Sequence, residues 1–124
     1  PDDEQKYDEG NVGRALMRPS FVTRLPLAVV PLAKESKDHP GFAEVFEFVM
    51  AGQELAPGYT ELNDPDAQLE NFKKQGENTD LDFVQAMMAG MPPAGGMGLG
   101  IDRLLAILTD QQSIRDVILF PLMK

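Results

Sequence analysis

The most constraining feature of this sequence is an apolar segment, Gly41 to Met50, that is followed at once by the dipeptide Ala51-Gly52. Phenylalanine and valine dominate the segment, and aromatic and β-branched side chains favour a strand. A short connection that contains glycine permits the tight turn of a hairpin. We therefore expect Gln53 to Leu62 to return as a second strand, interrupted at Pro57-Gly58, so that the fold contains an antiparallel sheet.

Four other segments predict strands. Phe21 to Leu25 and Leu27 to Val30 are short apolar runs that prolines separate. Gly95 to Gly100 is a glycine-rich strand, and Val117 to Phe120 is an apolar run that we expect to be a last, buried strand.

Three segments predict helices. Asp64 can cap a helix that has Pro65 at its first position, runs to about Lys74 and ends at Gly76. A second helix is expected from Asp80 to Ala89. A third is marked by apolar side chains at helical spacing, namely Ile101, Leu104, Leu105 and Leu108. Strands mixed with helices in this order predict an α+β fold, with an antiparallel β-sheet flanked by helices.

Composition narrows the functional classes. The 124 residues suffice for one compact domain with a modest core. Cysteine is absent, which excludes thiolate metal sites and fits a reducing cytoplasm, and the single histidine, His39, poorly supplies a His-rich metal site or a Ser-His-Asp triad. A net charge of −9 disfavours nonspecific binding of nucleic acid. No apolar run approaches the roughly 20 residues that cross a bilayer, so we expect no membrane partner.

Two glutamates on the expected hairpin are candidate metal ligands. If the turn is Ala51-Gly52, alternation of side chains places Glu47 and Glu54 on the same face. A carboxylate on a largely apolar strand is costly unless it is paired or holds a cation, and Mg²⁺ takes a few carboxylate oxygens together with substrate phosphates. The residues alone leave open whether this pair binds Mg²⁺, faces solvent or pairs with arginine.

Tyr59 and Glu61 can form a pocket for a cation, in which the ring takes an aliphatic stem or the ammonium and the carboxylate takes the charge. Strict alternation places Glu61 on the face opposite Glu54, and a bulge at Pro57-Gly58 would shift that register. An edge strand with an exposed glutamate is the alternative that these residues leave open. Lys34 is interpreted as a solvated charge.

A glycine-rich run, Gly95 to Arg103, is a third candidate site. It lacks the Gly-Lys-Ser/Thr of a Walker A loop and does not match the dinucleotide fingerprint. Gly98 and Gly100 fall on one strand face and leave room for a flat ligand against the backbone. Arg103 lies in the first turn of the next helix, where it can reach a phosphate. The alternative is a packing site where a helix crosses the strand closely.

Together these segments resemble the class II lysyl-tRNA synthetases, from about Arg18 to Lys124. The resemblance implies the C-terminal part of a class II catalytic domain over residues 18–124, after an acidic, poorly ordered or helical lead-in at residues 1–17. It rests on blocks that occur in one order, of which the fourth resembles motif 3: Pro31-Leu32-Ala33-Lys34, Tyr59 to Pro65, Gly90-Met91-Pro92-Pro93, Gly95 to Arg103, and Ser113 to Pro121.

The resemblance implies an ATP site with Mg²⁺ as cofactor. Glu47 and Glu54 would hold the Mg²⁺ ions that bridge the ATP phosphates. Arg103 would be the catalytic motif 3 arginine that meets ATP. Gly98 would line the floor of the site, and Gly100 would keep the backbone open for adenosine.

The resemblance also implies a lysine site. Tyr59 would lie against the lysine side chain, Glu61 would bind its ammonium, and Gly98 would border the same substrate. The family usually has asparagine at the position of Pro57, where it helps to hold substrate and metal. Proline supplies neither a side-chain amide nor an N–H, so the chain lacks that contact.

The implied reaction is ATP-dependent activation of lysine to lysyl-adenylate, followed by transfer to tRNA(Lys), in a cytoplasmic homodimer. Counterparts of motifs 1 and 2 and of the anticodon-binding domain are not found in the sequence. We therefore expect a fragment that is inactive, or nearly so, by itself. The alternatives are a fragment of a synthetase paralogue that lysylates a protein such as an elongation factor, and a non-catalytic module that binds another protein.

Overall fold

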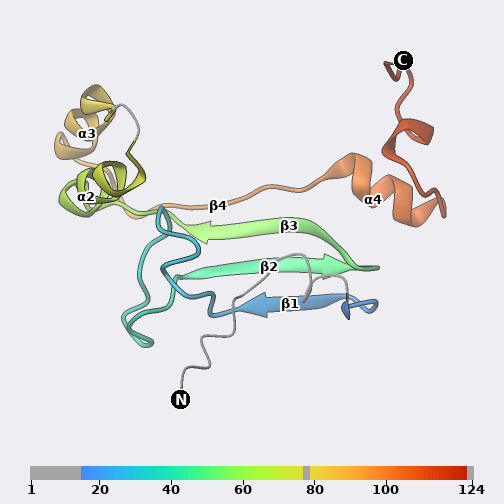
Figure 1. Cartoon of the computed structure of the whole chain (residues 1–124), viewed down its shortest axis with the longest axis horizontal. Helices are drawn as coiled ribbons and strands as arrows, with labels where there is room; N and C mark the ends of the chain where they lie inside the picture. Colours follow the sequence, from blue (N-terminus) through green and yellow to red (C-terminus); the bar gives the residue numbers. More distant parts are fainter. Residues whose placement is uncertain (1–14, 77–78, 123–124) are drawn as a thin grey trace. The chain divides into compact units, whose positions relative to one another are not determined.

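The computed structural model of the chain describes residues 15–76 and 79–122. Four strands form a sheet in the order β1-β2-β3-β4, and β3 pairs with β4 in antiparallel direction. The predicted α+β fold with an antiparallel sheet and helices is confirmed. The elements, labelled in Figure 1, are β1 (Ser20–Thr23), β2 (Val45–Met50), β3 (Gln53–Thr60), α2 (Pro65–Gln75), α3 (Leu81–Met88), β4 (Gly95–Met97), α4 (Ile101–Leu108) and the 3-10 helix η1 (Ile114–Asp116).

The chain divides into two compact units that alternate along the sequence. Unit 1 comprises Pro1–Val22, Glu47–Pro57 and Gly98–Lys124, and unit 2 comprises Thr23–Phe46 and Gly58–Met97. Most of the expected lead-in at residues 1–17 lies outside the described residues, which begin at residue 15.

Unit 1 has its core on the hairpin and on α4. Val49 and Leu55 are each 1% exposed, and Ala106 is the buried residue of α4. The rings of Phe21 and Phe48 lie 5.1 Å apart between centroids, so β1 and β2 also meet through aromatic side chains.

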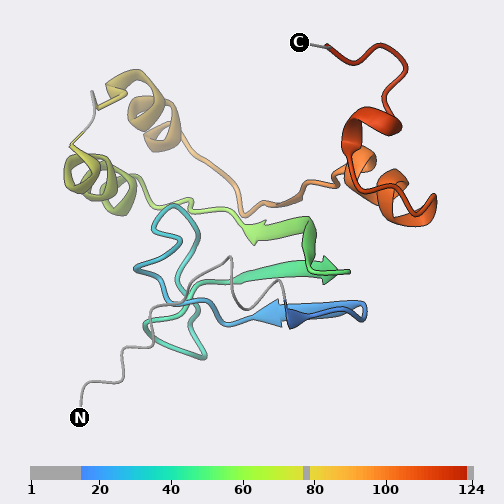
Figure 2. The same ribbon diagram turned by 45° about the vertical axis from the view of Figure 1, so that its right-hand side comes forward.

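Unit 2 contains the two helices α2 and α3, which lie side by side in Figure 1 and Figure 2. The ring of Phe72 meets that of Phe83 edge-on, at 6.2 Å between centroids. Val84 and Met87 are the buried residues of α3. Among the described residues, no helix has both the length and the apolar character that crossing a membrane requires.

The start and end of α2 follow from local signals, as predicted. The Asp64 side chain accepts hydrogen bonds from the backbone N–H groups of Asp66 and Ala67, and Pro65 takes the first helical position. Gly76 ends the helix with a left-handed φ of 71°.

Two predicted strands are not formed. Leu27 to Val30 is a turn, in which the Val29 N–H donates to the Pro26 carbonyl at 2.9 Å. Val117 to Phe120 has no strand conformation, and Leu119 and Phe120 are 89% and 91% exposed instead of buried. Both segments are apolar, but a strand also needs a neighbouring strand to receive its backbone hydrogen bonds.

β3 continues through the proline at which an interruption was expected, and its register changes on the way. The turn at Ala51-Gly52 places Met50 opposite Gln53. Farther along, the Thr60 N–H donates to the Glu44 carbonyl at 2.9 Å. Glu44 lies six residues before Met50, whereas Thr60 lies seven after Gln53, so β3 contains one extra residue, as in a β-bulge.

Candidate functional site

Glu47 and Glu54 lie on the hairpin of unit 1. Ala51 and Gly52 both have left-handed φ angles, 52° and 71°, which is the backbone geometry of a two-residue hairpin turn. With this turn Glu54 lies opposite Val49, and alternation places Glu47 on the same face as both. Each glutamate is half-buried. The turn geometry thus places Glu47 and Glu54 on one face of the hairpin, and their role as a pair of metal ligands stays a prediction.

The donor set on this face fits a metal that also binds phosphate. Among residues 15–76 and 79–122, no group of three or more His, Cys, Asp or Glu side chains is arranged to hold a metal ion. Mg²⁺ is usually bound by one or two carboxylates together with substrate phosphates and water. Glu47 and Glu54 match that pattern and do not match a cage formed by protein ligands alone.

Arg103 is an exposed residue in the first turn of α4. Its Nη1 donates a hydrogen bond to the Glu54 carbonyl at 2.8 Å, so the guanidinium is tied to the backbone of the hairpin. A guanidinium has five N–H donors in a planar fork. The bond to one carbonyl leaves enough of them to bind an anion such as a phosphate.

Gly98 and Gly100 continue the hydrogen bonding to β3 beyond the end of β4. The Gly98 N–H donates to the Pro57 carbonyl at 3.0 Å, and the Gly100 N–H donates to the Leu55 carbonyl at 2.8 Å. A Cβ at Gly98 would meet no atom within 4 Å, whereas a Cβ at Gly100 would touch Arg103 Cδ at 3.5 Å. Gly98 thus leaves open space for a ligand, and the space at Gly100 is bordered by Arg103.

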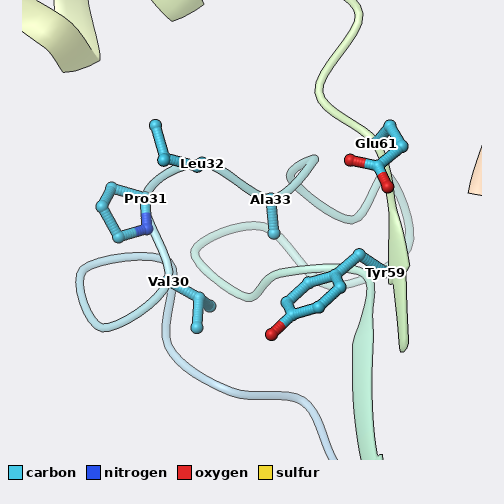
Figure 3. A pocket seen from close by; sticks show the side chains of 6 residues that line it. All are labelled: Val30, Pro31, Leu32, Ala33, Tyr59 and Glu61. Carbon is cyan, nitrogen blue, oxygen red and sulfur yellow. The ribbon is translucent and has the colours of Figure 1, made fainter. Parts of the chain in front are cut away.

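Tyr59 and Glu61 line a cavity of about 370 Å³ in unit 2. Figure 3 shows the Tyr59 ring and the Glu61 carboxylate on one side of it, and an apolar loop on the other. The size falls within the range of small-molecule pockets, and one carboxylate among apolar walls suits a ligand with an aliphatic stem and a terminal cation. Gly98 is not one of the lining residues, which are Val30, Pro31, Leu32, Ala33, Tyr59 and Glu61.

Hydrogen bonds fix the apolar loop from both ends. Lys34 Nζ donates to Asn63 Oδ1 at 3.0 Å, and the Asn71 side-chain amide donates to the Pro31 carbonyl. The Lys34 backbone N–H donates to the Thr60 carbonyl at 3.1 Å. The interpretation of Lys34 as a solvated charge is therefore wrong, because the loop folds back along β3 and brings this side chain to Asn63.

The loop is the part of the site to which sequence reasoning assigned no role. Residues 30–33 are four consecutive apolar residues, and the last three form, together with Lys34, one of the blocks that carry the family resemblance. The signal that the sequence offered for a pocket wall was an apolar run at a proline, and the structure leaves Leu32 in this run 46% exposed.

Comparison with known proteins gives consistent results. The family model for class II tRNA synthetases (D, K and N) matches residues 2–124. Similar relatives include proteins named Lysine–tRNA ligase from Moorella thermoacetica (48% identical), Hahella chejuensis (47%) and Neisseria meningitidis (48%), each over 126 aligned residues. Each match covers 94% of this chain and 25% or 26% of the relative. The chain thus spans about a quarter of the length of the curated relatives it matches.

Proposed function

Because the chain belongs to the class II tRNA synthetases of the D, K and N group, we propose that it is the part of a lysine–tRNA ligase that binds the lysine side chain and ATP phosphates. The whole enzyme would activate lysine with ATP and transfer it to tRNA(Lys). The observation that supports lysine is the cavity of about 370 Å³, in which Glu61 is the only carboxylate among the described residues that line it.

The chemistry of this cavity favours lysine over the other two amino acids of the group. The carboxylate of Glu61 would accept hydrogen bonds from the ammonium, and Tyr59 and the apolar loop would enclose the methylene groups. Aspartate would bring a second negative charge into the same apolar space, which is unfavourable. Asparagine would leave the charge of Glu61 without a counterion.

ATP is the proposed second substrate, on the hairpin face of unit 1. When bound, Mg²⁺ would supply positive charge to the phosphates, with Glu47 and Glu54 as its protein ligands. Arg103 would donate hydrogen bonds to a phosphate while its Nη1 keeps the hydrogen bond to the Glu54 carbonyl. The open backbone at Gly98 would accept a flat group of the ligand, and Gly100 would leave the backbone beside it accessible.

The partners of the whole enzyme belong to the same proposal, namely tRNA(Lys) and a second copy in a homodimer, in the cytoplasm. Because of its net charge of −9, this part of the enzyme should bind tRNA phosphates weakly. We therefore expect residues beyond these 124 to make most of the contacts with the tRNA backbone.

Titration calorimetry with L-lysine and L-norleucine tests the lysine site. Norleucine has the same aliphatic stem and no ammonium, so we expect lysine to bind more tightly. Glu61→Gln should weaken lysine binding by about tenfold or more, since a hydrogen bond to a charged group contributes about 1.5–3 kcal/mol.

Glu70→Gln, on the exposed face of α2, is the matched control and should leave lysine binding unchanged. Equal affinity for lysine and norleucine, or tighter binding of aspartate, would contradict the proposed substrate.

A further inference from the structure

Gly96 on β4 lies directly against the carboxylate that is proposed to bind the lysine ammonium. The register of β3 and β4 pairs Gly96 with Tyr59. A Cβ built on Gly96 would stand 3.0 Å from Glu61 Oε1, which is closer than ordinary van der Waals contact. The carboxylate therefore occupies space that the side chain of any other residue would take.

The backbone leaves Glu61 little freedom to move away. Its N–H donates to the Ala94 carbonyl at 3.0 Å, which continues the pairing of β3 with β4, and Glu61 also forms an antiparallel bridge with Ala33. Its neighbours on both sides along the sheet are thus fixed. With the backbone held in this way, the side chain alone would have to adjust to a group added at Gly96.

Gly96 differs from the glycines next to it. Gly95 pairs with Thr60, so alternation turns it to the opposite face, where a Cβ would meet the Tyr59 carbonyl at 3.3 Å. Gly98 has no atom within 4 Å of its Cβ position. Of these three glycines, only Gly96 borders the carboxylate of the cavity.

We propose that Gly96 is a positioning residue for lysine recognition, because its lack of a side chain lets the Glu61 carboxylate lie over β4 at the cavity. The inference rests on the proposed function. A methyl group at this position would displace the carboxylate by a few tenths of an ångström and turn it, and a hydrogen bond weakens when its distance and angle depart from the optimum.

A double-mutant cycle tests the contact without any ligand. Urea unfolding is measured for the unaltered chain, Gly96→Ala, Glu61→Ala and the double variant. Gly96→Ala should lower the urea midpoint when Glu61 is present, and should leave it unchanged or raise it in the Glu61→Ala background. Equal effects in the two backgrounds would overturn the inference.

Calorimetry with L-lysine tests the consequence for recognition. Gly96→Ala should raise the Kd for L-lysine about tenfold, as expected when a hydrogen bond to a charged group is impaired. The Kd for L-norleucine should stay within about twofold, which a general loss of structure would not allow.

Shortening the side chain at position 61 should restore most of the lysine binding that Gly96→Ala loses. In the Glu61→Asp background, the added methyl group has more room, so Gly96→Ala should raise the Kd for L-lysine less than threefold. An unchanged lysine Kd in Gly96→Ala overturns the inference and leaves the proposed function intact. Absence of lysine binding by the unaltered chain contradicts the proposed function, and the unfolding cycle then still decides whether Gly96 determines the place of the Glu61 carboxylate.

Discussion

The two units hold their candidate residues in different ways. In unit 2, Tyr59 and Glu61 face a loop that Lys34 and Asn71 fix by hydrogen bonds, and the cavity between them is already formed. In unit 1, Arg103 is exposed and Gly98 borders open space. A small apolar ligand with one charge needs walls that the protein supplies, whereas phosphates and their metal bring much of their own site with them. The cavity of unit 2 is therefore the more preorganised of the two candidate sites.

Substitution of a crowded glycine should lower the free energy of unfolding far more than substitution of a glycine beside open space. A Cβ on Gly58 would lie 2.3 Å from the Phe46 ring, inside unit 2, so Gly58→Val should destabilise the chain by about 3 kcal/mol through overpacking. Gly98→Ala in unit 1, where no atom lies within 4 Å, should change the free energy of unfolding by less than about 0.5 kcal/mol. Urea unfolding monitored by circular dichroism gives both values.

A Phe46→Ala background is the control for the first variant, because removal of the ring should make Gly58→Val much less costly. If Gly98→Ala instead destabilised the chain as strongly as Gly58→Val, the contrast between the units would not hold.

A smaller effect is expected for the loop of the cavity. Lys34→Met keeps the aliphatic stem and removes the hydrogen bond to Asn63, so it should lower the free energy of unfolding by about 1 kcal/mol. Lys37→Met is the matched control, since Lys37 is exposed in the same connector and should give no measurable change. Thermal unfolding followed by circular dichroism measures both. Equal shifts in the two variants would mean that the bond to Asn63 does not stabilise the loop.

The smallest effect is expected for Mg²⁺ without nucleotide. Two carboxylates on the hairpin face, with no larger ligand group among the described residues, should not bind the ion tightly until phosphates complete the coordination. Calorimetric titration of MgCl₂ should therefore give no micromolar site, and Glu47→Gln should change the heats little. A micromolar Kd that Glu47→Gln abolishes would show that unit 1 is as preorganised as unit 2.

Elements specified by neighbouring residues could be predicted from the sequence. The helix α2 has its cap, its first-turn proline and its terminal glycine within the thirteen residues from Asp64 to Gly76, and the hairpin turn is two residues long. The prediction of a strand at Val117 to Phe120 was wrong, because apolar character does not reveal whether a partner strand is available. The interpretation of Lys34 as a solvated charge was wrong for a similar reason, because its hydrogen-bond partner Asn63 is distant in sequence.

In the candidate site, too, the residues placed by local signals could be predicted, and the contacts between distant segments could not. Glu47 and Glu54 could be placed on one face because a turn of known length sets their register. Tyr59 and Glu61 could be named from their chemistry, but the loop opposite them follows from contacts between distant segments. The closeness of Gly96 to Glu61 could not be predicted, because it depends on the register of β3 with β4. No short turn joins these two strands, so the sequence does not set that register.

The exposed apolar segment after α4 has a consequence for the colloidal behaviour of the chain. Leu119, Phe120 and Leu122 are 89% or more exposed, so two chains that meet here can bury apolar area. The net charge of −9 opposes that encounter. Because the Debye length falls from about 30 Å at 0.01 M salt to about 8 Å at 0.15 M, added salt weakens the repulsion and leaves the apolar attraction in place. We therefore expect a rise in ionic strength to favour the association of two chains through this segment.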